Sequence, residues 1–200
     1  MPKDKSATSA RILACMREEF LAYGYEKASL NRIAKKFGIT TAGLYKHYHG
    51  KEDMFGALVK DTIDALDTLN ADGMGQLAED PSAYDPFREE WSRALVDFIF
   101  DHYDGAKLLI CRSHGSRFES FEEDLIQRET KSNQQFAELL TRCGNPVKPL
   151  TDMQWHLLST QYIHLVFEIV RHDLTREEAY QHMAFVRALL YPGWKEILGL

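Results

Sequence analysis

The sequence predicts an all-α protein, and three observations support that fold class. Apolar residues recur at helical spacing along most of the chain, and no run alternates in the manner of a strand. Residues that commonly cap helices precede several of these segments: Ser29, Thr40, Thr151 and Thr175. The chain of 200 residues, 44% hydrophobic and 27% charged, is long enough for a sizeable core and has an ordinary globular composition.

The first 50 residues are predicted to form three helices. The first helix, about residues 8–23, places Ile12, Met16 and Phe20 on one side. That apolar stripe would cover the two shorter helices that follow and complete a small domain over residues 1–50.

The two shorter helices have the pattern of a helix-turn-helix. Ser29 caps the first of them, and Gly38 can take the left-handed conformation that ends it. Thr40 caps the second, which is expected over residues 41–48 with Leu44 facing inward. In a helix-turn-helix the second helix enters the DNA major groove, so this segment predicts a DNA-binding domain.

Residues 51–200 are predicted to form a larger helical domain. The expected elements are helices at about residues 51–69, 87–103 and 118–143, a short apolar segment at 107–113, a loop at 71–86, and two helices that begin after Thr151 and Thr175. Gln154 and Glu178 stand three residues after these threonines, as a capping box requires.

Two residues in this larger domain are expected to interrupt helices. Gly105 should end the helix that precedes it. Pro192 disfavours helical geometry at Tyr191, so the last helix is expected to break there.

Charge is divided unevenly between the two predicted domains. The net charge is −6, which alone would argue against a nucleic-acid partner. Residues 1–60, however, hold 11 basic and 6 acidic side chains, a balance of +5, and the remainder therefore carries −11. A basic end on an acidic chain favours phosphate binding where the helix-turn-helix lies.

The N-terminal motif resembles the tetracycline-repressor (TetR) family. The residues that carry the resemblance lie within the first sixty: Phe20, Gly24-Tyr25, Ile33-Ala34, Phe37-Gly38-Ile39-Thr40, Leu44-Tyr45, Tyr48 and Lys51-Glu52-Asp53-Met54. The sequence departs from the family pattern at Ala28, where threonine is usual, at Phe37, where a small residue is usual, and at His49-Gly50.

The resemblance implies a homodimer that binds a palindromic DNA operator. Its two recognition helices would meet half-sites about 34–36 Å apart, one turn of the duplex. The residues expected to contact DNA are Ser29, Arg32, Lys36, Thr40, Thr41, Ala42, Gly43, Tyr45, Lys46, His47 and Lys51. Small residues at 41–43 allow close approach to base edges, Tyr45 and Lys46 face the groove, and Ser29 and Lys51 stand at helix N-termini that favour phosphate.

The resemblance also implies that residues 51–200 form an effector-binding and dimerisation domain. The last two helices should pair with those of a second chain through Trp155, Leu158, Tyr162, Val166, Ile169, Met183, Val186 and Leu190. A small-molecule effector is expected among aromatic residues and a histidine: Trp91, Phe98, His102, Phe118, Phe121, Trp155, Tyr162 and Phe167. The implied function is a repressor that the effector releases from DNA.

Other readings have less support in the sequence. It contains no Gly-rich phosphate loop, no Gly-x-Ser-x-Gly elbow and no His-Glu-x-x-His zinc motif, so no enzyme and no cofactor are predicted. His164, Glu168 and His172 lie four apart and Cys111 and His114 three apart, but each group lacks further ligands nearby, and no metal site is predicted. Two alternatives remain: a C-terminal domain that binds a protein partner, and an activator in place of a repressor.

The cellular location is expected to be the cytoplasm. No apolar run approaches the roughly 20 residues that span a membrane, and the N-terminus lacks the apolar core of a signal peptide. The three cysteines, Cys15, Cys111 and Cys143, are odd in number and far apart, which favours reduced thiols.

Overall fold

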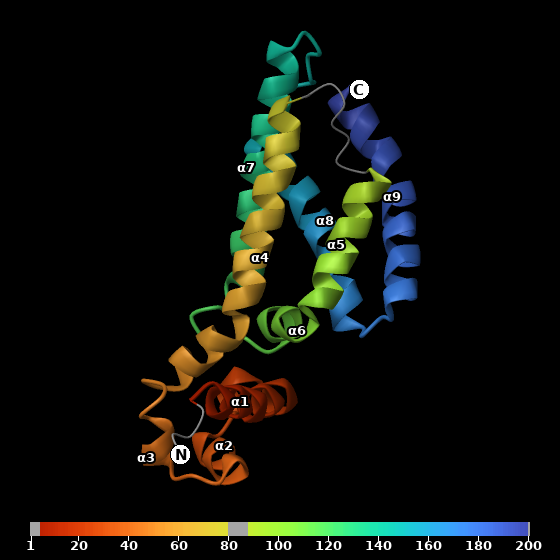
Figure 1. Ribbon diagram of the computed structural model, residues 1–200. Helices are drawn as coiled ribbons and strands as arrows, with labels where there is room; N and C mark the ends of the chain where they lie inside the picture. The colour runs from red at the N-terminus through yellow and green to blue at the C-terminus, as the bar shows by residue number, and fades with distance from the viewer. Residues whose placement is uncertain (1–4, 80–87, 200) are drawn as a thin grey trace. The chain divides into compact units, whose positions relative to one another are not determined.

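The computed structural model describes residues 5–79 and 88–199, with the side chains of residues 5–9 and 73–79 left aside. Over these residues the chain is helical and contains no strand, which confirms the predicted all-α class. The helices are α1 Lys5–Lys27, α2 Leu30–Phe37, α3 Thr41–Leu44, α4 Lys51–Glu79, α5 Glu89–Asp101, α6 Tyr103–Cys111, α7 Phe121–Arg142, α8 Asp152–Arg171 and α9 Arg176–Leu198 (Figure 1).

The chain folds into two compact units. The first, called the head here, comprises Met1–Asp64 and His102–Ser120, and the second, the body, comprises Ala65–Asp101 and Phe121–Leu200. This division differs from the predicted boundary after residue 50, because α6 packs against α1 and therefore belongs with the helix-turn-helix. Three points of the chain connect the units, and at one of them, between Asp64 and Ala65, the connection is helical.

The core of the head forms as its apolar spacing predicts. Ile12, Met16 and Phe20 of α1 are fully buried, and Leu44 of α3 is buried with them. Gly24, with φ 72° and ψ 169°, then interrupts α1. Glycine reaches this positive φ without the steric penalty that a Cβ brings, so the chain turns here while α1 continues to Lys27.

The capping residues of the helix-turn-helix act as predicted. The Ser29 hydroxyl accepts from the amide of Arg32, and the Thr40 hydroxyl accepts from the amide of Gly43. Gly38 ends α2 in the left-handed conformation, with φ 85°. Each cap satisfies an amide or carbonyl group that a short helix would otherwise leave exposed.

The regular part of α3 is shorter than the predicted 41–48. It ends at Leu44. The Tyr45 amide still bonds four residues back, to Thr41 O, but the next two amides bond three back: Lys46 N to Gly43 O at 3.3 Å and His47 N to Leu44 O at 3.0 Å. Hydrogen bonds of this spacing tighten the chain into a turn of 3₁₀ type. The segment therefore presents one α-helical turn followed by a tighter one.

Two predicted interruptions in the chain between α4 and α6 are wrong. The α4 helix continues past residue 69 to Glu79, so the first part of the predicted loop at 71–86 is helical, and residues 80–87 lie outside the described part. The break between α5 and α6 falls at His102, whose φ is −121° and ψ 29°, while Gly105 lies inside α6.

Gly105 is explained by a close helix crossing in the head. A Cβ placed at Gly105 would overlap Oγ1 of Thr62 on α4 and lie 2.9 Å from the Cβ of that threonine. Glycine is therefore required here for the approach of α6 to α4, and it is tolerated in the helix at a cost of about 1 kcal/mol relative to alanine.

The body pairs α5 with α9 and α7 with α8 (Figure 1). Both predicted capping boxes are present, at Thr151 with Gln154 and at Thr175 with Glu178. The helices α8 and α9 run in opposite directions, because His182 Nε2 contacts Leu165 O at 2.7 Å across the turn that joins them.

The predicted break at Tyr191 is wrong, since α9 runs through Pro192 to Leu198. A proline inside a helix costs about 3 kcal/mol. The turns beyond it are held to the body, because Trp194 and Leu198 are buried and the amide of Lys148 donates to Leu198 O at 2.8 Å.

Gly105→Ala should destabilise the protein by about 1–3 kcal/mol, because the new methyl group overpacks the contact with Thr62. Chemical denaturation followed by circular dichroism measures the change. Gly193→Ala is the matched control: Gly193 also lies within a helix, and no atom of the described residues lies within 4 Å of its added Cβ. That variant should gain up to about 1 kcal/mol from helix propensity. Equal effects at the two glycines would contradict the crossing.

Candidate nucleic-acid interface

The outward surface of α3 and the turn after it is the candidate DNA-binding surface. Ala42, Lys46 and His47 are exposed, and Tyr45 keeps 50% of its surface exposed although it is aromatic. Thr41 and Gly43 are partly buried, and Leu44 anchors the segment in the core. A buried leucine therefore fixes a segment whose remaining side chains are free to meet a ligand.

Asn31, which the sequence analysis missed, positions this surface. The Thr41 hydroxyl donates to Asn31 Oδ1 at 2.8 Å, which ties the first residue of α3 to α2. The threonine proton is occupied by this bond, so its oxygen is left to accept from a donor. Thr40 acts as the cap of α3, and its hydroxyl faces the helix amide.

Glu19 joins α1 to α2 through several hydrogen bonds, and the sequence analysis did not identify it either. Its carboxylate is buried, accepts from the Ser29 amide at 2.8 Å and accepts from Arg32 Nε at 2.7 Å. The Arg32 guanidinium also donates to Lys27 O at 2.9 Å and lies 4.3 Å above the Tyr23 ring. The hydrogen bond to Glu19 raises the pKa of Arg32. Arg32, predicted as a DNA contact, thus bonds to residues of the head while 48% of its side chain stays exposed.

Two other predicted contacts have different surroundings. Lys36 forms an ion pair with Glu18, and both side chains are more than half exposed. The Lys51 ammonium donates to Glu26 O at 2.8 Å and lies 4.8 Å from the Tyr25 ring centroid. Burial lowers the pKa of Lys51. Exposed ion pairs contribute little energy, so Lys36 can leave its partner Glu18 at less cost than Lys51 can leave its own contacts.

The segment after α6 is fastened to the same end of α1. The Tyr25 amide donates to Arg112 O at 2.8 Å, and Arg112 Nε donates to Leu21 O at 2.9 Å. Glu52 at the start of α4 accepts from the Tyr25 hydroxyl at 2.7 Å and from the Arg117 amide at 3.1 Å. Burial, with the Glu52 hydrogen bond, raises the pKa of Tyr25 to about 12. The start of α4 and the end of α6 are therefore coupled through Tyr25.

The predicted effector residues are divided between the two units. His102 and Phe118 belong to the head, where Phe118 packs 5.8 Å from Phe55, and the other six belong to the body. Phe121 stacks on Phe167 at 6.3 Å, and Trp155 borders a hollow of about 590 Å³ between the end of α7 and the start of α8. A second hollow of the body, between α5 and α9, has none of the eight on its walls.

A polar cluster lies between α7 and α8 in the body. Asn133 Nδ2 lies 3.2 Å from Ser159 Oγ and 3.4 Å from Glu129 Oε1, and both Asn133 and Ser159 are buried. Burial raises the pKa of Glu129. No sequence pattern indicates this cluster, because Ser159 comes from a different helix than the other two residues.

The predicted dimer residues belong mainly to the core of a single chain. Seven of them are at most 9% exposed: Trp155, Tyr162, Val166, Ile169, Met183, Val186 and Leu190. The eighth, Leu158, is partly buried. The large apolar side chains that α8 and α9 leave exposed are others: Met153, Leu157, Phe185, Leu189 and Ile197. Their spacing of four or eight residues within each helix was the signal that could have revealed them.

The metal-like patterns are engaged in ion pairs. Glu168 bonds to Arg171 at 3.1 Å and to His172 at 2.8 Å, while His164 faces Glu122 at 3.1 Å. His114 lies 3.5 Å from Glu119. Over the described ranges, no three histidine, cysteine or acidic side chains are grouped as a metal site would require. No helix within the same ranges is long and apolar enough to cross a membrane.

The head matches a protein family by sequence. Residues 12–58 match the family model described as "Bacterial regulatory proteins, tetR family". Over these residues the chain is similar to the TetR family. The match covers the helices that carry Glu19, Asn31 and Tyr45, and so includes the candidate interface.

A curated relative is similar over the same region. The uncharacterized HTH-type transcriptional regulator TtgW of Pseudomonas putida is 36% identical over 52 residues. That match spans 26% of this chain and only 39% of the relative's length.

Solved structures resemble the whole fold. A TetR-like regulator from Rhodococcus sp. RHA1 has a TM-score of 0.62 at 16% identity, covering 97% of this chain and 98% of its own. FadR from Bacillus subtilis, solved in complex with stearoyl-CoA, has a TM-score of 0.57 at 12% identity, covering 91% and 97%. NalD, the secondary repressor of the MexAB-OprM multidrug efflux pump in Pseudomonas aeruginosa, has a TM-score of 0.56 at 16% identity. The match covers 92% of this chain and 96% of NalD. At these identities the likeness shows the fold.

Glu19→Gln should destabilise the protein by about 1–3 kcal/mol, because the Ser29 amide and the Arg32 guanidinium lose a charged acceptor. The neighbouring Glu18→Gln is the control: Glu18 forms the exposed pair with Lys36, and its loss should cost less than about 1 kcal/mol. Denaturant midpoints of the two variants give the comparison. Similar midpoints would show that Glu19 does not join α1 to α2.

Proposed function

We propose that this chain is a cytoplasmic homodimeric repressor of the TetR family that binds a palindromic operator and is released by a small molecule bound in its body. The observation that carries the proposal is the exposed polar face of α3, with Tyr45 50% exposed above a buried Leu44. An aromatic side chain that is left exposed beside lysine and histidine suits contact with a DNA groove and its phosphates.

The DNA contacts divide into two groups. Thr41, Ala42, Gly43, Tyr45 and His47 approach base edges, where Ala42 can meet a thymine methyl group and the Thr41 oxygen can accept from a base. Ser29, Lys36, Lys46 and Lys51 contact or attract phosphates.

Arg32 and Thr40 contribute to DNA binding by holding the helix-turn-helix in shape. Arg32 joins α1 to α2 through Glu19, and Thr40 caps α3. A shape fixed before binding reduces the ordering that association would otherwise require.

Dimerisation uses the exposed apolar face of the last two helices. From the contact of His182 with Leu165, counting eight residues along each of two antiparallel helices puts Leu157 level with position 190, about one residue from Leu189. Leu157 is 58% and Leu189 52% exposed, and Met153 and Phe185 extend the same two rows. Exposed apolar rows on adjacent helices are what a second copy would cover.

Release by an effector needs a difference in affinity between two states of the protein. A ligand that binds both states equally shifts nothing, so it must favour the DNA-incompetent arrangement. The chain passes between the body and the head along α4 and at the two ends of the segment His102–Ser120. Since Tyr25 donates both to Glu52 of α4 and to the Arg112 carbonyl, a shift in either element reaches α1 and the helix-turn-helix behind it.

Lys46→Ala and Tyr45→Ala should each weaken binding to a duplex selected from random DNA by the wild-type protein. Loss of Lys46 should flatten the dependence of log affinity on log salt by about one unit, as expected for one phosphate contact. Lys60→Ala is the control, since Lys60 is an exposed lysine of the head that pairs with Asp64 on α4. Folded Tyr45 and Lys46 variants that bind as well as the Lys60 variant would refute this interface.

Leu189→Glu should raise the dimer dissociation constant by at least about tenfold, because it places a charge in an apolar contact. Sedimentation velocity across a dilution series measures it. Ala184→Glu, on another side of the same helix and also exposed, should leave the dimer intact. A wild-type protein that is monomeric throughout the series would assign the exposed face to a protein partner instead of a second copy.

A further inference from the structure

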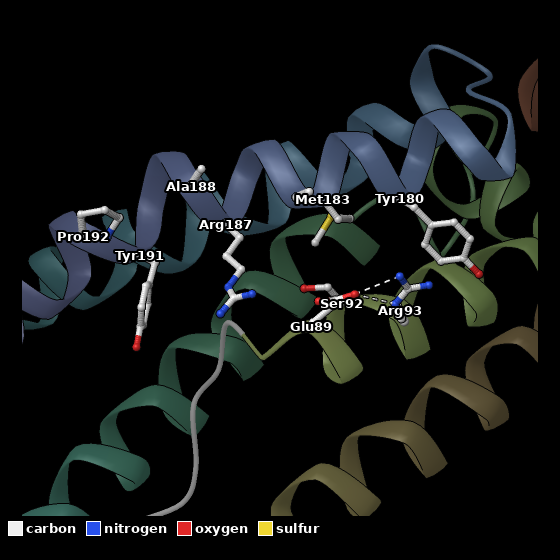
Figure 2. A pocket seen from close by; sticks show the side chains of 10 residues that line it. Glu89, Ser92, Arg93, Tyr180, Met183, Arg187, Ala188, Tyr191 and Pro192 are labelled. Carbon is white, nitrogen blue, oxygen red and sulfur yellow. Dashed lines mark hydrogen bonds and ion pairs between the residues drawn. The ribbon is translucent and has the colours of Figure 1, made fainter.

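A groove between α5 and α9 has the features of a ligand site in the body. Its volume is about 520 Å³, within the range of about 300–1,000 Å³ found for small-molecule sites. Figure 2 shows side chains from both helices around it, among them Ser92, Arg93, Tyr180, Arg187 and Tyr191.

The charges of the groove do not balance. Glu89 and Arg93 neutralise each other at 2.9 Å, and the Arg93 guanidinium lies 5.3 Å from the centroid of the Tyr180 ring. Arg187 stands differently: among the described residues it makes no hydrogen bond or ion pair, and its guanidinium lies 5.9 Å from the centroid of the Tyr191 ring (Figure 2). The charge of Arg187 also acts on the Glu90 carboxylate, but it is the smallest of the causes that lower the pKa of Glu90.

Within the part of the chain that the structure describes, the groove therefore carries one positive charge that has no ion-pair partner. The chain as a whole is acidic, with a net charge of −6. A guanidinium on a wall of low polarity favours an anion, and its planar pair of N–H donors matches a carboxylate.

Most of the wall that α9 contributes is apolar. Met183, Ala184, Ala188, Tyr191 and Pro192 line the groove along α9, and Met183 is itself almost fully buried. A ligand that pairs only its charge with Arg187 would leave this surface wet. The wall thus favours an apolar portion beside the anionic group.

This face of α9 is separate from the proposed dimer face. At about 100° per residue, Arg187 and Tyr191 project roughly a third of a turn or more away from Phe185 and Leu189. A ligand can therefore occupy the groove in a dimer.

We propose that the groove between α5 and α9 binds a small amphipathic organic acid, whose carboxylate pairs with Arg187 and whose hydrocarbon part covers the α9 wall. The claim that the groove binds this acid depends on the shape and charge of the groove. The further claim that the acid is the effector rests on the proposed repressor function.

Isothermal titration calorimetry of the full chain tests the site with decanoate and the neutral decanamide, both below the concentration at which decanoate forms micelles. Decanoate should bind at least about tenfold more tightly than the amide, the size of effect expected from a charge-assisted hydrogen bond. Arg187→Gln should remove that preference and leave the amide affinity unchanged.

Two further variants make the test specific. Lys195→Gln should change neither affinity, although Lys195 lies 5.3 Å from the same Tyr191 ring, because it does not line the groove. Ala188→Phe fills the groove from an exposed position and should weaken both ligands. Equal binding of acid and amide, a preference that survives Arg187→Gln, or no binding of either compound would each overturn the proposal.

A parallel titration of the selected DNA duplex separates the two proposals. Decanoate that binds without releasing DNA would leave the site standing and remove its effector role. A protein that binds decanoate with the expected preference but binds no duplex would refute the proposed repressor function, not the site.

Discussion

The carboxylate of Glu19 is the interaction on which the candidate interface depends. It is buried between α1 and α2, where it accepts from the first amide before α2 and from the Arg32 side chain. A buried carboxylate is costly unless donors surround it, and here both a backbone and a side-chain donor do. This carboxylate holds the start of α2 against α1, and α2 in turn holds α3 through the bond between Asn31 and Thr41.

The same logic extends from α2 to α6. Gly24 lets the chain turn at the end of α1, and the turn brings the Tyr25 amide to Arg112 O. Gly105 lets α6 approach α4 closely enough for contact with Thr62. Two glycines thus allow residues 102–120 to pack into the head, which the helical pattern alone would assign to the body. Within the head, α6 therefore contacts α1 directly.

The sequence was informative where the physics is local. The helix caps form as predicted, because a cap needs only a hydroxyl and the amides two or three residues on. The exposed interface residues follow from the register of a short helix around Leu44, whereas Glu19 depends on partners from another helix. Local rules also failed at Gly105 and Pro192. A close crossing with α4 requires the glycine, and the buried Trp194 holds the turn beyond the proline. The free-energy cost of one unfavourable residue is smaller than the free energy gained by burying the side chains of the turns that continue the helix.

The final helix explains why the predicted dimer residues were core residues. α9 carries a buried row with Met183, Val186 and Leu190, a groove row with Arg187 and Tyr191, and an exposed apolar row with Phe185 and Leu189. A helix that is apolar on more than one side satisfies the sequence pattern for a core and for an interface equally well. Only the packing of α5 and α8 decides which row is used inside the chain, and that choice leaves the other two rows available to partners.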